Sequence, residues 1–305
     1  MKSKSQSRYV DGVLLLDKPI GMTSNTVLQK VKQLYNACKA GHTGSLDPLA
    51  SGMLPICLGQ ATKFSQFLLE ANKSYRVIAK LGIKTTTGDG EGRIVEEREV
   101  KNISVEQITK LLQKFHGEIE QIPSMYSAIK YKGRPLYKLA REGITVKCKP
   151  RIVTIYKLEL LGYGKNLLEL EICCSKGTYI RTLVEDIGEE LKCGAYVVAL
   201  RRLQCGAYLE SQMVTLQHLE DLFAKRGEKA IDHLLLSVES IVADWPKVIL
   251  SEAAAYYIQH GQAIISPCNT SSKGRVCFKM RDGHFLGVGK ILENGKIAPC
   301  RLINL

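Results

Sequence analysis

Apolar residues along the chain follow two different periods, which predict strands interspersed with helices. The apolar run at residues 13–16 predicts a buried strand that ends at Lys18-Pro19. Alternation of apolar and polar residues predicts a further strand at residues 75–81. Residues 152–161 and 167–174 have the character of strands on either side of a glycine-rich turn, so we expect them to pair.

Helices are predicted where apolar residues recur every three or four positions. Thr23 or Ser24 caps the first of them, and Ser104 and Gln107 form a capping box at the start of another. Further helices are predicted over residues 61–69, 178–191 and 253–259, and a short strand over residues 54–58. The polar segment at residues 224–229 predicts a surface connection.

The order of these elements favours an α+β fold, because strands and helices alternate without the regular repeat of a doubly wound sheet. From about residue 241 the pattern changes to compact strands, with hairpin turns predicted at Asp282-Gly283 and Asn294-Gly295. We therefore expect a large α+β domain over residues 10–240 and a small β-rich domain over residues 241–305. A disordered basic tail is expected at residues 1–9.

Composition narrows the choice of partner and compartment. The 305 residues include 43 basic and 30 acidic side chains, a net charge of +13, which favours a polyanionic partner. No apolar run reaches the length of about eighteen residues that predicts a membrane span, and no apolar segment follows the basic N-terminus. The ten cysteines form no C-x-x-C pair. We therefore expect a cytoplasmic protein with reduced thiols, no membrane contact and no metal or cofactor.

One carboxylate stands out in the segment from Gly41 to Leu54, which reads Gly-His-Thr-Gly-Ser-Leu-Asp-Pro-Leu-Ala-Ser-Gly-Met-Leu. Asp47 lies there among apolar, small and hydroxyl residues, and no lysine or arginine occurs between Lys39 and Lys63. The glycines and the proline predict a shaped loop rather than a helix or a strand. A carboxylate in such surroundings is costly unless a distant cation meets it or chemistry uses it. The alternative is an Asp-Pro turn in which the side chain accepts a backbone N–H.

This segment resembles the catalytic motif of the TruB family of tRNA pseudouridine synthases, G-H-T-G-(A/S/T)-L-D-P-x-A-(S/T)-G. Other segments resemble further motifs of the family, in the family's order and spacing. They are Gly12 to Pro19, Lys73 to Val77, Cys174 to Thr182 and Leu200 to Leu203. The resemblance implies the family's catalytic domain, built on a mixed, mainly antiparallel sheet with flanking helices, followed by a PUA-like RNA-binding domain.

The resemblance also implies an activity, the conversion of uridine 55 in the T-loop of tRNA to pseudouridine. In that reaction the C1′–N1 bond breaks and the uracil is rejoined through C5. One carboxylate should suffice because the departing base is also the incoming nucleophile, whereas glycoside hydrolases use two carboxylates. We expect Asp47 to be this carboxylate. The sequence leaves open whether Asp47 attacks the ribose, attacks the base or removes a 2′ proton.

Four more residues are expected at the reacting nucleotide. Arg181 is expected to pair with Asp47, to hold it ionised and to lower its pKa. Tyr75 is expected to stack on the extruded uracil with its hydroxyl near C5, while Tyr179 and Leu200 line the same pocket. The alternative for Arg181 is a surface salt bridge or a phosphate contact, and for the others it is ordinary core packing.

A second group of residues is expected to contact the RNA. His42 fills the gap that the flipped nucleotide leaves, or else it is a turn histidine bonded to the backbone. Asp89 aligns with a family acidic residue near the active site, or else it is a turn aspartate. Lys18 and Lys63 are expected to contact phosphates, and the alternative for each is a solvated lysine.

We therefore predict a tRNA pseudouridine synthase, an isomerase that recognises the T-arm and acts as a monomer without an obligatory protein partner. Two rivals remain. One is an RNA-binding chaperone that folds tRNA and does not need Asp47. The other is a different enzyme, such as a pseudouridine synthase with another RNA substrate or a nucleosidase, although the motif offers no partner that would activate water for a nucleosidase.

Overall fold

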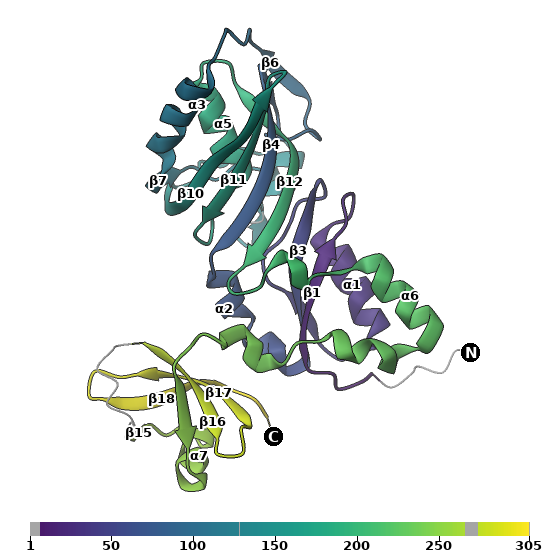
Figure 1. Cartoon of the computed structure of the whole chain (residues 1–305), viewed down its shortest axis with the longest axis vertical. Helices are drawn as coiled ribbons and strands as arrows, with labels where there is room; N and C mark the ends of the chain where they lie inside the picture. The colour runs from purple at the N-terminus through teal and green to yellow at the C-terminus, as the bar shows by residue number, and fades with distance from the viewer. Residues whose placement is uncertain (1–6, 128, 266–273, 305) are drawn as a thin grey trace.

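The computed structural model describes residues 7–127, 129–265 and 274–304. Within these residues, nine strands form the central sheet of the large unit (Figure 1). In spatial order they are β13 (Val214–Thr215), β1 (Gly12–Lys18), β3 (Ala50–Leu58), β12 (Ala195–Cys205), β4 (Lys73–Leu81), β11 (Leu167–Cys174), β10 (Arg151–Gly164) and β7 (Gly117–Gln121), with β2 (Ala40–His42) paired to β3. The parallel pairs in the described sheet are β1 with β13 and β3 with β12, and the others are antiparallel. The expected α+β fold with a mixed, mainly antiparallel sheet is confirmed.

The register of three central strands brings separated motifs together. Gly52 on β3 lies opposite Arg202 on β12, and Arg202 lies opposite Tyr75 on β4. Leu200, two residues earlier on β12, pairs with Ala50. Gly52 is needed in this row because its φ is +95° and a Cβ there would lie 2.2 Å from the carbonyl oxygen of Arg202. The close approach of β3 to β12 therefore fixes one side of the site.

Helices cover the sheet and supply the remaining site residues. Two of them, α3 (Val105–Leu112) and α5 (Ile180–Glu190), lie beside each other, α3 against β10 and α5 against β12, and their apolar faces join the main core (Figure 1). Arg181 sits in the first turn of α5, two residues after the helix cap at Tyr179. Near β1 and β3 lie α1 (Ser24–Leu34) and α6 (Leu216–Arg226).

Shorter elements complete the large unit. They are η1 (Gly59–Lys63), α2 (Ser65–Glu70), β5 (Ile83–Thr85), β6 (Ile94–Glu97), η2 (Gln113–Phe115), β8 (Lys130–Tyr131), β9 (Arg134–Pro135), α4 (Leu136–Arg141), η3 (Glu210–Gln212), η4 (Glu228–Leu234) and η5 (Val238–Val242).

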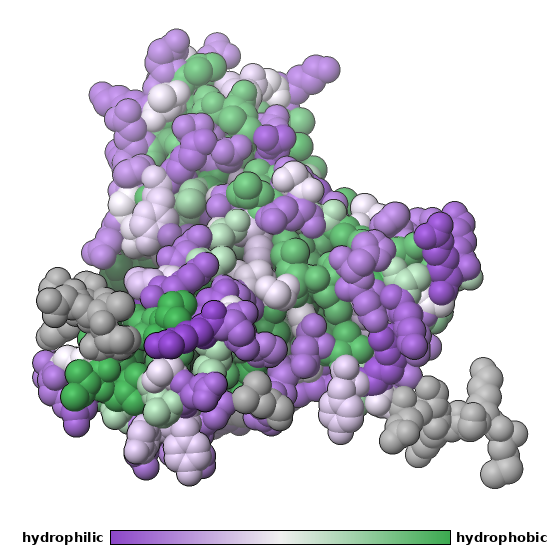
Figure 2. Space-filling view, turned by 60° about the horizontal axis from the view of Figure 1, so that its bottom comes forward, coloured by the Kyte–Doolittle hydropathy of each residue, from purple (hydrophilic) through white to green (hydrophobic). Residues whose placement is uncertain are grey.

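The C-terminal unit is a separate sheet whose strands follow the order β14 (Lys247–Leu250), β16 (Arg275–Met280), β17 (Phe285–Ile291), β18 (Lys296–Leu302) and β15 (Ile264–Ile265), with α7 (Glu252–Gln259) against it. Both predicted hairpin turns are confirmed, with Gly283 and Gly295 at positive φ. The unit has its own apolar core, including Val248, Ile258 and Phe278. Figure 2 turns this unit toward the viewer and shows hydrophobic and hydrophilic residues interspersed on that face.

The two units also share one apolar cluster. Phe64, between η1 and α2, packs against Phe285 of β17. Phe67, in α2, packs against Trp245. The guanidinium of Arg275 lies 5.1 Å from the Phe67 ring centroid and 5.6 Å from that of Trp245. The junction between the units is therefore a packed core rather than a linker.

Several sequence predictions of local structure were wrong. The predicted surface connection at residues 224–229 begins inside α6, which ends at Arg226. The turn between β10 and β11 places Lys165 and Asn166 at positive φ instead of a glycine. Of the predicted disordered tail, residues 1–6 lie outside the described residues, whereas Arg8 pairs with Ala37 and reaches Asp232 at 2.6 Å.

Candidate active site

Asp47 is carried by a short loop, residues 43–49, which we call the Asp47 loop. The predicted loop was longer, but its flanks belong to β2 and β3. The Ser24 hydroxyl accepts a hydrogen bond from the Leu46 N–H at 2.8 Å and donates one to the Leu46 carbonyl at 3.0 Å. On the other side of Asp47, the Pro48 carbonyl accepts a hydrogen bond from the Gly21 N–H at 2.8 Å. The backbone on both sides of the carboxylate is therefore held in place.

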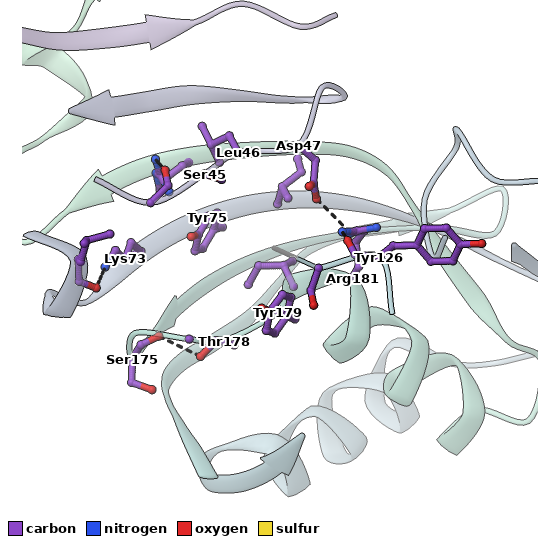
Figure 3. A pocket seen from close by; sticks show the side chains of 17 residues that line it. Ser45, Leu46, Asp47, Lys73, Tyr75, Tyr126, Ser175, Thr178, Tyr179 and Arg181 are labelled. Carbon is purple, nitrogen blue, oxygen red and sulfur yellow. Dashed lines mark hydrogen bonds and ion pairs between the residues drawn. The ribbon is translucent and has the colours of Figure 1, made fainter. Parts of the chain in front are cut away.

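Arg181 is the distant cation that the sequence predicts for Asp47. Its Nε lies 3.0 Å from Oδ2 of Asp47, and Figure 3 shows the carboxylate pointing from its loop toward the guanidinium. The Arg181 side chain is 8% exposed, whereas the Asp47 side chain is 39% exposed. The ion pair therefore has a buried cation and a carboxylate that reaches solvent.

The Arg181 guanidinium is anchored by three further acceptors. Nη1 donates to the Thr87 carbonyl at 2.8 Å and to Oδ2 of Asp89 at 3.1 Å, and Nη2 donates to the Tyr126 carbonyl at 3.0 Å. Such multiple bonding suits the planar guanidinium and leaves it little freedom to rotate. Arg181 therefore acts as a fixed support for Asp47.

Asp89 was expected to contact the RNA, but only 3% of the residue is exposed. Its Oδ1 accepts hydrogen bonds from the Thr87 hydroxyl at 2.5 Å and from the Glu91 N–H at 3.1 Å. Asp89 is thus a buried turn residue that supports Arg181, and it also lines the pocket that His42 faces; its contact with substrate stays a prediction.

As expected, Arg181 lowers the pKa of Asp47, but the net shift of this pKa is upward. Burial by the surrounding protein raises the pKa of Asp47 above its ordinary value, although the side chain itself projects into an open pocket. Arg181 and Lys18 lower this pKa, but Asp89 raises it, and the opposing charges do not cancel the effect of burial. Asp47 is therefore a more basic carboxylate than a solvated aspartate.

The carboxylate lines a pocket of about 310 Å³, which we call the Asp47 pocket. Tyr75 on β4, Tyr179 at the start of α5 and Leu200 on β12 all line it, as the sequence predicts, and Figure 3 shows the two tyrosines with Asp47 and Arg181. Burial raises the pKa of both tyrosine hydroxyls, so both stay protonated at neutral pH. The pocket thus offers two aromatic faces, an apolar side and one carboxylate.

His42 faces a second pocket of about 450 Å³. This pocket and the Asp47 pocket both include Asp47 and Arg181 among their lining residues. The Nδ1 atom of His42 is buried and has no hydrogen-bond partner among the described residues, so the alternative of a turn histidine bonded through that atom is not seen. Burial, with a smaller effect of Arg202, lowers the pKa of His42. A neutral imidazole therefore lies next to the Asp47 loop.

The two lysines that were expected to contact phosphates are already engaged. Lys18 is fully buried and donates to the carbonyls of Pro19 and Ala50, at 2.8 and 2.7 Å, while burial lowers its pKa to about 8. Lys63 donates to the Leu302 carbonyl at 3.2 Å and to Asn304 at 2.7 Å, in the C-terminal unit. Lys18 therefore holds Ala50, the first residue of β3, and Lys63 links the large unit to the C-terminal unit.

Sequence analysis missed other residues of the Asp47 pocket. Arg202, Lys73 and Tyr126 line it, and Gln121 exchanges hydrogen bonds with the backbone of Tyr179 at 3.0 and 3.3 Å. Arg202 carried a signal in the sequence, because adjacent arginines on a strand must face opposite sides of the sheet. One of the two arginines in the segment from Leu200 to Leu203, Arg201 or Arg202, therefore had to point inward.

Two other kinds of feature are absent from the described part of the chain. No helix there is long and apolar enough to cross a membrane. No group of three or more histidine, cysteine, aspartate or glutamate residues there could hold a metal ion.

Family models match almost the whole chain. The model described as TruB family pseudouridylate synthase (N terminal domain) matches residues 32–180. The model described as tRNA pseudouridylate synthase B C-terminal domain matches residues 181–243, and the model described as Pseudouridine synthase II TruB, C-terminal, matches residues 246–303.

Curated relatives agree with these models over nearly full length. A protein of Coxiella burnetii (strain RSA 493 / Nine Mile phase I) named tRNA pseudouridine synthase B is 55% identical over 97% of this chain and 96% of its own. Proteins of the same name from Pseudomonas fluorescens (strain Pf0-1) and Nitrosococcus oceani are 53% and 52% identical, over 97% and 98% of this chain and 96% of theirs.

Solved structures show the same fold. A chain in a crystal structure of a Cbf5–Nop10–Gar1 complex superposes with a TM-score of 0.75 at 28% identity, covering 96% of this chain and 84% of that chain. A chain in an H/ACA RNP bound to a substrate RNA containing 2′-deoxyuridine gives 0.74 at 26% identity, covering 96% and 85%. Together with the sequence relatives, these findings show that this chain belongs to the TruB family of pseudouridylate synthases, which are isomerases.

Proposed function

We propose that this chain converts uridine 55 in the T-loop of tRNA to pseudouridine and that Asp47 is its catalytic carboxylate. Relatives that are 52% to 55% identical over nearly the whole chain bear the name tRNA pseudouridine synthase B, which supports tRNA as the substrate. The observation that carries the assignment of Asp47 is its ion pair with the anchored Arg181, at a pocket with two tyrosines and a leucine.

The proposed reaction balances without a cofactor. The C1′–N1 bond breaks, a C1′–C5 bond forms, the proton on C5 is lost and N1 gains a proton. The pocket volume of about 310 Å³ lies at the lower end of the range of about 300–1,000 Å³ for small-molecule sites, which suits one flipped nucleotide rather than a duplex. Asp47 then acts on the sugar or base, while Tyr75 and Tyr179 hold the uracil by their ring faces.

We also propose that residues 10–240 form the catalytic domain and that residues 241–305 form a PUA-like RNA-binding domain. The separate sheet and core of the C-terminal unit support this division. The net charge of +13 suits a protein that binds the phosphate backbone of tRNA. On this proposal the T-arm lies at the Asp47 pocket, and the C-terminal unit binds the tRNA elsewhere.

The deciding experiment incubates the purified chain alone with an unmodified tRNA transcript and maps pseudouridine at single-nucleotide resolution. We expect product at position 55, and none at that position in a matched transcript with cytidine there. Because no other protein is present, product also supports the proposal that the chain needs no obligatory protein partner.

Two other results would point to the rival functions. Tight tRNA binding with faster tRNA refolding but no product would favour the chaperone. Product at another uridine, or only in another RNA, would contradict the proposed substrate position.

A further inference from the structure

Arg202 is a buried cation in the pocket wall with no carboxylate partner. Only 2% of the residue is exposed, yet it lines the Asp47 pocket. No aspartate or glutamate within the described residues forms an ion pair with it. A buried charge without a counter-ion is costly, so its retention requires another explanation.

The hydrogen bonds of Arg202 lead to the Asp47 loop and to the strand that follows it. Its Nε donates to the Met53 carbonyl at 2.6 Å, and its Nη2 donates to the Gly44 carbonyl at 3.2 Å. Gly44 belongs to the Asp47 loop and lies at a φ of +93°. One guanidinium therefore joins the two backbone segments that flank the catalytic carboxylate.

The other neighbour of Arg202 is Tyr75. The two residues are directly opposite on antiparallel β12 and β4, so their side chains project from the same face of the sheet. Both line the Asp47 pocket. Burial raises the pKa of the Tyr75 hydroxyl, and the positive charge of Arg202 opposes this effect.

We propose that Arg202 is a positioning residue that couples Tyr75 to the Asp47 loop, so that the phenol and the carboxylate keep one fixed relation across the pocket. The row Gly52, Arg202 and Tyr75 across β3, β12 and β4 provides the frame. This inference rests on the proposed function, because it assigns a role within the same site.

Arg201 offers a matched control on the same strand. It faces the other side, where it binds Asp17 through two bonds of 2.9 and 2.8 Å and Glu210 at 2.8 Å. It does not line the Asp47 pocket. Arg201→Met and Arg202→Met thus remove the same charge from the same strand, on opposite faces.

The test is a double-mutant cycle of Arg202→Met and Tyr75→Phe, read as single-turnover pseudouridine formation at saturating enzyme. Methionine keeps the length and the apolar contacts of the stem and leaves no unpaired charge behind. We expect Arg202→Met to slow the rate by about 10- to 100-fold with tRNA affinity unchanged, as is typical when a catalytic group is misplaced. In the Tyr75→Phe background, Arg202→Met should reduce the single-turnover rate by a much smaller factor, because the two residues act as a unit.

Each outcome distinguishes this inference from the proposed function. No product from the unaltered protein would refute the proposed function. A parent-like rate in Arg202→Met, equal losses in both backgrounds, or an equal loss in Arg201→Met would each overturn the role of Arg202. If Arg202→Met melts below the assay temperature, the cycle is run with Arg202→Lys, which keeps the buried charge but cannot donate to both the Met53 and the Gly44 carbonyls with the geometry of the guanidinium. The same non-additive loss is then expected, and additive losses overturn the inference.

Discussion

Asp47 and Asp89 bind different nitrogen atoms of one guanidinium group, that of Arg181. Nε of Arg181 lies 3.0 Å from Asp47, and Nη1 lies 3.1 Å from Asp89. One cation thus serves two carboxylates, of which only Asp47 lines the Asp47 pocket. Asp89 raises the pKa of Asp47 through its negative charge, so it adds to the larger effect of burial and works against Arg181.

The first prediction is a pair of opposite shifts in the pH–rate profile. If ionised Asp47 is required, the single-turnover rate falls as the pH drops through the pKa of Asp47. Asp89 raises this pKa, so Asp89→Asn should move the acid limb to lower pH. Lys18 lowers it, so Lys18→Met should move the acid limb to higher pH. Rates across the acidic range, with melting temperatures as controls for folding, test this. Shifts of the same sign in both variants would contradict the electrostatic account.

The second prediction concerns Asp47→Asn, which keeps the size of the side chain and removes its charge. Turnover should fall by about four orders of magnitude, as when a central catalytic group is lost elsewhere. Affinity for tRNA should persist, because phosphate contacts dominate it and Asp47 adds only negative charge. Filter binding and single-turnover assays on one transcript provide the measurement, with Asp221→Asn on the exposed surface of α6 as the control. Near-normal turnover would remove Asp47 from the chemistry.

The third prediction separates nucleotide flipping from chemistry. His42 lines the pocket beyond the Asp47–Arg181 pair and, with its lowered pKa, is neutral at physiological pH. We expect His42→Ala to slow turnover by about 10- to 100-fold while product still forms, because an unstacked nucleotide costs only a few kcal/mol to hold. The exposed His218→Ala on α6 is the matched control. A variant as inactive as Asp47→Asn would assign His42 to the chemical step.

The fourth prediction concerns the junction of the two units. Arg275→Ala removes an ion pair with Glu70 at 3.0 Å and the cation–π contacts with Phe67 and Trp245. The ion pair is largely exposed, so the expected loss of unfolding free energy is about 1 kcal/mol and comes mainly from the aromatic contacts. Thermal unfolding measures it, with Arg281→Ala in the exposed β16–β17 turn as the control. An equal effect of both substitutions would show that Arg275 does not brace the junction.

Much of the fold follows from local pattern. The buried run of β1, the capping box of α3 and the two glycine hairpins were predictable because the physical signal lies within a few residues. By contrast, the polarity at residues 224–226 concealed the end of α6, whose buried face is formed by Leu216 and Leu219. A helix that buries only a narrow stripe leaves a weak pattern.

Most residues of the site were predictable from the sequence, but the burial of its charged groups and the net pKa shift of Asp47 were not. The Asp47–Arg181 pair joins residues on different elements, and the motifs indicated it before any geometry was known. The burial of Lys18 was not indicated, because a lysine beside a proline at a strand end usually reaches solvent. Likewise, the net upward shift of the Asp47 pKa comes first from burial, which outweighs the lowering by Arg181, and the extent of that burial is set by tertiary packing.

The strand register also sets when activity can first arise during synthesis. Asp47 and Tyr75 leave the ribosome early, but Arg181 and the β12 row come well past the middle of the 305-residue chain. Domains form in the order in which their segments are made, and pairings between distant segments form slowly. A nascent chain that lacks β12 has no strand to pair with both β3 and β4. A copy that ends before β12 therefore lacks Leu200 and Arg202 and cannot complete the Asp47 pocket.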